Sequence, residues 1–233
     1  ILPFEKEFYQ NFDYEVTFVG HPLIDAIADR NKVDISHFRS QNNLDERPII
    51  AILPGSRKQE ITKMLAVMLS IIDDFKDYQF VIAGAPSQDF SFYKQIIGAK
   101  NVGFINNKTY DLLSVSTAAL VASGTATLET ALFKVPQVVC YKGGFISYQI
   151  AKRIITLKFI SLVNLIMDKE VVTELIQNNF TRSNLKKELS KILAPDQREK
   201  LFLDYYDLET KLGGKGASRK TAKSIVSDLK KLK

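Results

Sequence analysis

The chain has 233 residues, of which 45% are hydrophobic and 25% are charged, with a net charge of +6, one cysteine and no tryptophan. This composition excludes an intrinsically disordered chain, a collagen-like repeat and a small disulfide-stabilised domain. The lone Cys140 sits among apolar residues, which predicts a buried thiol in a reducing compartment, by default the cytosol. No apolar run reaches the roughly 18 residues of a membrane span, and the start of the chain lacks the pattern of a signal peptide.

The first part of the chain alternates between short β-branched runs and helical patterns. A segment at 15–29 predicts a strand and then a helix that begins near Pro22, and it precedes the series like a connector. Because strands in series with intervening helices form a parallel sheet with right-handed crossovers, we predict an α/β fold with a doubly wound parallel sheet. The runs predict strands at 48–55, 78–85, 101–105, 118–122 and 136–141, with helices at 58–75, 90–97, 109–115 and 124–133.

Helical patterns dominate after Tyr141 and predict a C-terminal extension. Its last helix carries one apolar stripe, which needs something to cover it. Residues 181–233 hold 14 basic and 7 acidic residues, so the extension is basic while the rest is near neutral. The stretch 142–160 mixes basic and large apolar side chains, which suits either an anionic membrane surface or a core helix with solvated lysines. The predicted helices lie at 148–157, 169–178, 184–193, 195–212 and 217–231.

The loop after the first predicted strand of the series has the residues for a phosphate site. Gly55 permits a tight turn and a close backbone approach, Ser56 is able to cap the next helix, and Arg57 lies in its first turn. The free N–H groups of a helix start and the fork of an arginine both suit phosphate oxygens. Ordinary helix capping is the alternative interpretation of the same residues.

The loop after the fourth predicted strand combines small residues with a carboxylate one turn further along a helix. Glu129 is not half of a capping box, because Ala126, three residues earlier, has no side-chain oxygen. It shares a helix face with Thr125, so it is placed to accept hydrogen bonds from the vicinal hydroxyls of a ribose. Phosphate on the helix start and sugar on the carboxylate describe a nucleotide site. The candidates are Ser123, Gly124, Thr125, Ala126, Thr127 and Glu129.

Other sites have weaker support in the sequence. Residues 101–106 offer backbone groups to the edge of a base, a weak pattern by itself. A Walker loop and a GxGxxG motif are both absent, which argues against an ATPase and an NAD enzyme. The only histidines are His21 and His37, so a His-rich metal site is excluded and a Ser-His-Asp triad has little to work with. We expect neither a metal ion nor a cofactor.

Four segments occur in an order and spacing that resemble one family. From Ile1 to about Leu193 the chain resembles the lipid-A-disaccharide synthases, which are glycosyltransferases with two Rossmann-like lobes of the GT-B type. Val163 and Thr173 stand where that family usually has proline, which affects the expected turn geometry more than the function. The segments are FVGHPL (18–23), LPGSRKQE (53–60), ASGTATLE (122–129) and LVNLIMDKEVVTELIQ (162–177).

The resemblance implies an enzyme of lipid A biosynthesis. It would join UDP-2,3-diacylglucosamine to 2,3-diacylglucosamine 1-phosphate, forming a β-1,6-linked disaccharide and UDP without a metal. Arg57 and the helix start at 124–127 would stabilise the leaving diphosphate, Glu129 would hold the ribose, and the backbone near Phe104 and Ile105 the uracil. Asn164 and Gln177, which fall in motifs of the family, are further substrate-binding candidates.

The resemblance also implies a division of the chain. In the family the acceptor lobe, with the catalytic base, precedes the donor lobe. We therefore expect residues 1–20 to be a remnant of the N-terminal lobe and a connector, and 21–193 to be a UDP-sugar-binding lobe. Residues 194–233 would be basic helices that pack on the other lobe or on a partner subunit. On this basis we expect the chain alone to bind UDP without appreciable turnover.

The implied partners are UDP, its diacylglucosamine derivative, the acylated acceptor and the anionic cytoplasmic face of the inner membrane, which a peripheral protein would meet. A homodimer through the C-terminal segment is a further option. The alternative enzymes are another UDP-GlcNAc-dependent glycosyltransferase, such as the one that builds the peptidoglycan lipid intermediate, and a UDP-GlcNAc epimerase. A nucleic-acid binder is disfavoured, because the lysines of the basic tail are interspersed with acidic residues.

Overall fold

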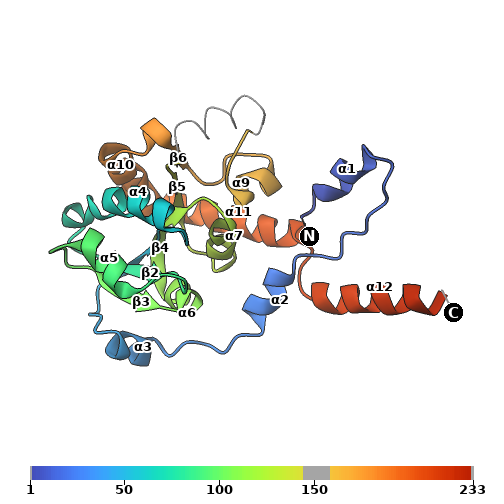
Figure 1. Ribbon diagram of the computed structural model, residues 1–233, viewed down its shortest axis with the longest axis horizontal. Coiled ribbons are helices and arrows are strands. Elements are labelled where there is room, and N and C mark those ends of the chain that lie inside the picture. Colours follow the sequence, from blue (N-terminus) through green and yellow to red (C-terminus); the bar gives the residue numbers. More distant parts are fainter. Residues whose placement is uncertain (1, 144–157, 232–233) are drawn as a thin grey trace.

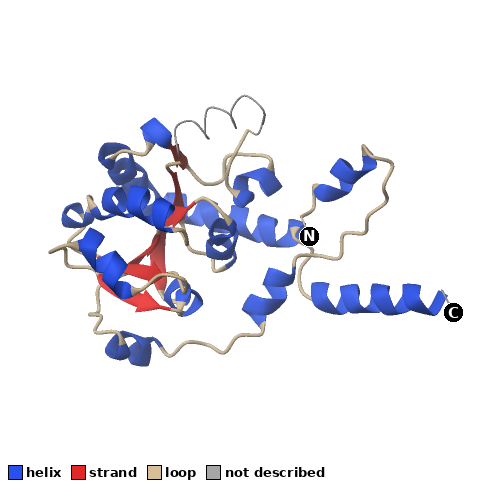
Figure 2. Ribbon diagram, viewed as in Figure 1, coloured by secondary structure: helices blue, strands red, loops and turns tan. Residues whose placement is uncertain are grey.

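The computed structural model of the protein describes residues 2–143 and 158–231 (Figure 1). The helix predicted at 148–157 therefore lies outside the described residues. Strands occupy the interior and helices surround them (Figure 2). Within the described ranges, none of the helices combines the length and the apolar character of a transmembrane span.

Six parallel strands form the sheet, in the order β3-β2-β1-β4-β5-β6. The prediction of a doubly wound parallel sheet is confirmed, and so are its five strands. The strands are β1 (Ile49–Leu53), β2 (Gln79–Gly84), β3 (Gly103–Asn106), β4 (Ser116–Ala122), β5 (Gln137–Tyr141) and β6 (Glu174–Ile176).

The sixth strand, β6, replaces a predicted helix. The prediction of a helix at 169–178 is wrong: these residues form a turn, the three residues of β6 and the start of a 3-10 helix, Gln177–Asn179. Val171, Val172 and Leu175 have helical spacing, but pairing of the segment with β5 prevails over this local pattern.

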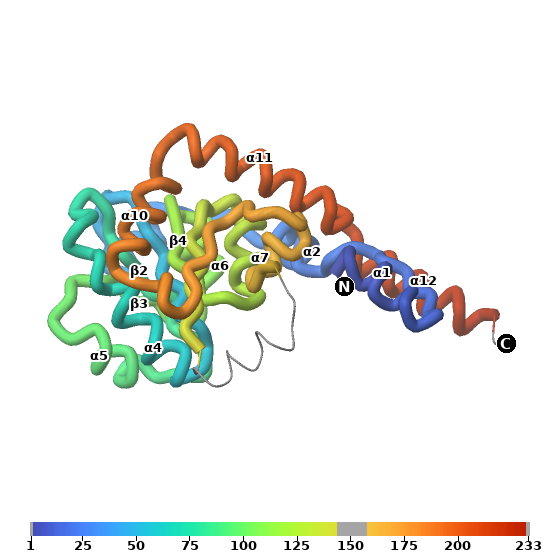
Figure 3. The backbone as a smooth tube through the Cα atoms, turned by 90° about the horizontal axis from the view of Figure 1, so that it is seen from above, coloured from blue at the N-terminus to red at the C-terminus, as the bar shows by residue number. Residues whose placement is uncertain are grey.

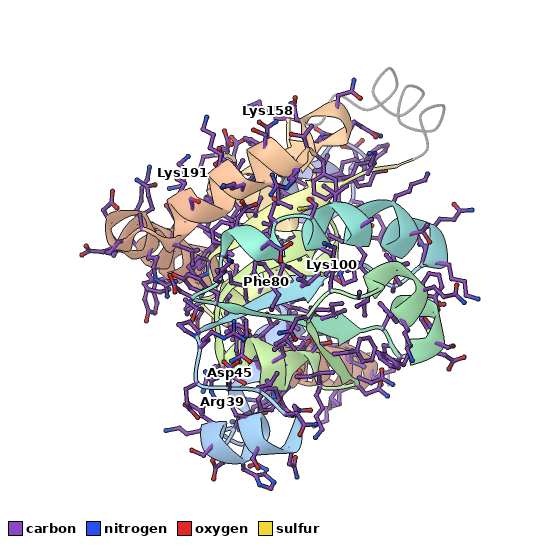
Figure 4. All side chains as sticks on the ribbon, turned by 90° about the vertical axis from the view of Figure 1, so that its left-hand side faces the viewer. Arg39, Asp45, Phe80, Lys100, Lys158 and Lys191 are labelled. Atoms are coloured by element: carbon purple, nitrogen blue, oxygen red, sulfur yellow. The ribbon has the colours of Figure 1, made fainter. Side chains whose placement is uncertain are left out.

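Both faces of the sheet are covered, which explains why its strands are continuous apolar runs. Successive residues of β1 alternate between two cores: Ile50 and Ile52 belong to a larger one, and Ile49 and Ala51 to a smaller one on the other face. Phe80 of β2 lies within the larger core (Figure 4). That core is covered by helices α4, α5, α10 and α11, and the smaller one by α3 and α6. These helices are α3 (Ile35–Gln41), α4 (Lys58–Leu69), α5 (Phe90–Ile97), α6 (Thr109–Ser114), α10 (Arg182–Leu193) and α11 (Pro195–Lys211).

Side-chain ties fix the ends of several of these helices. The helix predicted to continue to Phe75 ends at Leu69 and is followed by a 3-10 turn at Ile72–Asp74. Asp74 in that turn accepts hydrogen bonds from Arg182 and Lys186 of α10, at 2.6 and 2.8 Å. On the other face of the sheet, Arg39 of α3 donates to the backbone oxygens of Asp45 and Arg47, just before β1 (Figure 4).

The N-terminal segment is not part of the sheet. It holds α1 (Glu5–Gln10), an extended stretch at 14–21, and α2 (Pro22–Ala28). The helix predicted near Pro22 is found as α2, but the strand predicted at the start of 15–29 is wrong, because this stretch lies beside the end of α11: the His21 N–H donates to the Leu212 oxygen at 2.9 Å. A Cβ on Gly213 would lie 3.0 Å from the Gly20 Cα, so the two chain segments cross in close contact.

The C-terminal helices differ in how they are packed. Helix α11 contacts α10, α7 (Thr125–Leu132) and α9 (Leu162–Met167), and its Tyr205 and Leu208 are fully buried. Lys134, just after α7, donates to the Tyr205 oxygen and to Glu209 at 3.0 and 2.6 Å. Helix α12 (Ala217–Lys231) instead extends away from the sheet, on the same side as α1 (Figure 3).

Candidate functional site

A cavity of about 400 Å³ opens at the carboxyl ends of β1, β2 and β4. Leu53 ends β1 beside Val121 of β4, and the strand order reverses its direction at this pair. Ligands of open α/β sheets bind in the crevice at such a reversal. The loops that follow β1 and β4 supply most of the lining, so the two loops singled out in the sequence lie together here.

The β1–α4 loop approaches the cavity through a glycine. Gly55 has a φ of +102°, and a Cβ there would lie 2.9 Å from Glu60 Oε2, so only glycine fits without strain. The loop is tied to the next one, because Ser87 Oγ and Gln88 Nε2 donate to the Ser56 oxygen at 3.2 and 3.3 Å. This second anchor fixes the loop against the end of β2.

Arg57 stands at the mouth of the cavity, and its side chain is 83% exposed. It is the N-cap residue of α4, so the prediction that Ser56 caps this helix is wrong by one position. Its guanidinium pairs with Glu60 Oε1 at 3.2 Å. Glu60 lines the same cavity, and because an exposed ion pair of this kind is weak, Arg57 can leave it for a ligand at little cost.

The β4–α7 loop presents the start of a helix to the same cavity. Gly124 is the N-cap, with a φ of +156°, and Thr125 and Ala126 follow it in the lining. The first N–H groups of a helix have no intrahelical acceptor and favour an anion. Ser123 also lines the cavity, and its hydroxyl donates to the Ile160 oxygen at 2.9 Å. Thr127 is turned inward instead: it is fully buried and donates to the Gly124 oxygen at 2.8 Å.

Glu129 lines the cavity one turn further along α7. Its Oε1 accepts a hydrogen bond from the Tyr110 hydroxyl at 2.9 Å. Burial, together with the charge of Glu129, raises the pKa of Tyr110 well above its usual range. The tyrosine therefore stays protonated and remains a donor. Tyr110 was not among the residues predicted from the sequence. It is one of the nine tyrosines of the chain, and no motif surrounds it.

The two residues expected near a base do not line the cavity. The Phe104 ring covers Gly84, where a Cβ would lie 2.4 Å from it, and packs against Phe90 and Tyr93 with ring centroids 4.7 and 5.0 Å apart. Ile105 is buried in the smaller core. Thr109, in the helix that follows this strand, lines the cavity instead.

Asn164 and Gln177 also lie away from the cavity. Asn164 is fully buried and serves as a tie between α9 and β6: its Nδ2 donates to the Val172 oxygen and to Glu174, both at 2.8 Å. Its Oδ1 accepts from the N–H groups of Val171 and Val172. Gln177 follows β6 with a φ of +51°. Across residues 2–143 and 158–231, no group of three His, Cys, Asp or Glu side chains is arranged to hold a metal ion.

Solved structures share this architecture. UDP-GlcNAc 2-epimerase from Neisseria meningitidis, crystallised with UDP-GlcNAc, aligns with a TM-score of 0.67 at 16% identity, over 95% of this chain and 59% of that one. The calicheamicin glycosyltransferase CalG4 aligns with a TM-score of 0.54 at 15% identity, over 80% of this chain and 44% of that one. The fold is therefore that of a Rossmann-like lobe of GT-B glycosyltransferases and related epimerases, as predicted.

Sequence comparison gives the family. A family model described as lipid-A-disaccharide synthetase matches residues 1–227. The lipid-A-disaccharide synthase of Syntrophus aciditrophicus (strain SB) is 36% identical over 99% of this chain and 62% of its own length. The chain belongs to the lipid-A-disaccharide synthetase family, which confirms the resemblance, and it spans about 60% of the length of the curated relatives it matches.

Proposed function

We propose that the cavity at the ends of β1, β2 and β4 is the UDP-sugar site of a lipid-A-disaccharide synthase. In the reaction, the 6-hydroxyl of 2,3-diacylglucosamine 1-phosphate replaces UDP at the anomeric carbon of UDP-2,3-diacylglucosamine. The observation that supports the site most directly is the convergence of Arg57, the start of α7 and Glu129 on one cavity. Membership in the family supports the choice of substrates over those of other UDP-GlcNAc enzymes.

The proposed roles follow from charge. The departing diphosphate gains negative charge as its bond to the anomeric carbon breaks and the new glycosidic bond forms, and donors fixed near that charge stabilise the transition state. Arg57 and the N–H groups of Thr125 and Ala126 are the donors that the cavity offers. Glu129 would accept hydrogen bonds from the ribose hydroxyls. The uracil would lie beyond the cavity lining, against the backbone near Phe104 and Ile105 at the end of β3. Thr127, Asn164 and Gln177 would act by supporting the loops.

We also propose the partners and the location of the whole protein. Residues 1–20 would belong to the N-terminal lobe and its connector, and 21–193 to the UDP-sugar lobe. Residues 194–233 would be basic helices that pack on the N-terminal lobe or on a partner subunit. The protein would work at the cytoplasmic face of the inner membrane as a peripheral protein. The basic residues of 142–160 and of the C-terminal tail support this, because clustered lysines bind anionic lipid surfaces.

Calorimetric titration of this chain with UDP tests the site. A charge-assisted hydrogen bond contributes about 1.5 to 3 kcal/mol, so Arg57→Ala is expected to weaken UDP binding roughly 10- to 150-fold. Lys63→Ala is the matched control, since Lys63 is an exposed cation on the same helix, α4, that does not line the cavity. Equal affinities for UDP in the wild type and the Arg57 variant would remove Arg57 from the site. No binding of UDP by the wild type at millimolar concentration would contradict the proposed site altogether.

A further inference from the structure

Glu129 accepts a hydrogen bond from a tyrosine that does not line the cavity. Tyr110 belongs to α6 and lies beside Glu129 of α7, and its hydroxyl donates to Oε1 at 2.9 Å. Only Glu129 of the two lines the cavity. Because one hydroxyl donates one hydrogen, the lone pairs of Oε2 stay available to a ligand.

The tyrosine ring is itself fixed on two sides. The guanidinium carbon of Arg30 lies 5.0 Å from the centre of the Tyr110 ring, and the Phe133 ring centre lies 5.3 Å from it. Arg30 follows α2, and it forms an ion pair with Asp111, the residue after Tyr110. Both side chains of this pair are about 30% exposed. A cation over an aromatic face is attracted by the ring quadrupole, so Arg30, after α2, and Phe133, the C-cap residue of α7, hold the tyrosine ring from two segments.

This arrangement matters because a glutamate side chain is flexible. A free carboxylate has to give up rotamer freedom when it binds a sugar, and each immobilised side chain of this kind costs about 0.5 to 1.5 kcal/mol. A carboxylate already fixed through one oxygen has lost that freedom before the ligand arrives. The protonated state of Tyr110 keeps the tie in place at neutral pH.

We infer that Tyr110 is a positioning residue that orients Glu129 toward the vicinal hydroxyls of a nucleotide ribose, and that Arg30 fixes the Tyr110 ring for this purpose. The inference rests on the proposed UDP site and adds to it a determinant of sugar specificity. The Tyr110 hydroxyl would then raise the affinity for ligands that carry both ribose hydroxyls and leave the affinity for ligands without them unchanged.

The test compares UDP with 2′,3′-dideoxy-UDP, which lacks both hydroxyls, by calorimetry on the full chain. The wild type is expected to prefer UDP. Tyr110→Phe should reduce that preference roughly 2- to 12-fold, with binding of the dideoxy compound unchanged. Tyr206→Phe is the matched control, because Tyr206 is exposed on α11 and does not line the cavity. A general loss of stability would weaken the binding of both ligands alike and would leave the ratio of their affinities unchanged.

A second variant keeps the inference testable if Tyr110→Phe folds poorly. Arg30→Met keeps the tyrosine hydroxyl but removes the cation above the ring, and it should lower the preference in the same direction by a smaller factor. Glu129→Gln serves as the reference that abolishes most of the preference. If Glu129→Gln does so while Tyr110→Phe and Arg30→Met leave the ratio unchanged, the inference is wrong and the UDP site stands. If the wild type binds neither compound, the site and the inference fail together.

Discussion

Two regions of the molecule, which we call the body and the arm, both contain amphipathic helices, but only the helices of the body have their apolar side covered. The body comprises residues 22–143 and 158–212, and the arm comprises residues 2–19 with α1 and 214–231 with α12. In the body, α4 places Leu65 and Met68 in the core without any exposure. In the arm, α12 has an equally clear apolar stripe, yet Ile225 and Leu229 on it are 55% and 59% exposed. In Figure 3, α1 and α12 of the arm project away from the body.

The contrast shows what an amphipathic pattern specifies. Apolar residues at helical spacing predict a helix and the face that has to be covered, but they carry no information about the partner that covers it. Helix α4 follows β1 after a short loop and shares the larger core with Ile50 and Ile52 of that strand, so its burial follows from local topology. For α12 the spacing gives the helix correctly, and only the packing of the described residues shows that the stripe remains exposed.

The largest effect should come from matched leucines on the two helices. Leu65→Ala removes a side chain from the closely packed body and is expected to lower the free energy of unfolding by about 3 to 5 kcal/mol. Leu229→Ala makes the same change on the exposed stripe of α12 and should alter it by less than about 0.5 kcal/mol. Urea unfolding of both variants measures the difference. A large loss for Leu229→Ala would mean that the arm is packed in solution on something that covers this stripe.

The joint between body and arm offers the next sharpest comparison. Gly213 has a φ of +85°, and a Cβ there would lie 3.0 Å from the Cα of Gly20. Gly214 has a φ of +62°, with open space around the same position. Gly214→Ala is therefore expected to lower the free energy of unfolding by about 1 kcal/mol, the cost of a left-handed backbone for alanine. Gly213→Ala adds a clash with the backbone of Gly20, so it is expected to lower the free energy of unfolding by about 2 to 3 kcal/mol. Equal losses in urea unfolding would show that the crossing segments separate easily.

The body was predictable from the sequence because its signals are local. The run at 48–55 contains both a strand of β-branched residues and the glycine that the turn after it needs. Buried strands that end in small residues and a helix start identify the loops, and all loops after parallel strands meet at one edge of the sheet. This topological rule is enough to bring Arg57, Thr125 and Glu129 together in a prediction.

What the sequence missed depends on tertiary packing. The Tyr110 contact joins residues 19 positions apart on two helices, and its geometry is set by how α6 and α7 pack. Phe104 lies near the right strand end, but its ring is used to cover Gly84. The segment at 15–20 has strand-like residues, yet its neighbour is the end of α11. In each case a distant segment decided the outcome over a local preference.

The smallest effect concerns the contact by which the body holds α12. Asp25 of α2 accepts hydrogen bonds from the N–H groups of Gly216 and Ser218, at 2.6 and 3.0 Å, and so caps α12 from outside that helix. Asp25→Asn should therefore speed amide hydrogen exchange in the first turn of α12 and leave the exchange of β1 unchanged. Asp29→Asn is the control, because Asp29 is the exposed residue directly after α2.

The same contact gives this prediction a pH dependence. The bonds from Gly216, first, and from Ser218 lower the pKa of Asp25 below its usual value of 3.8. The stabilisation is therefore complete above that usual value and is lost as the pH falls through the lower pKa of the folded protein. Protection factors in α12 of the wild type and of Asp25→Asn should differ at pH 7 and converge in acid. If they are equal at pH 7, Asp25 does not cap α12 in solution.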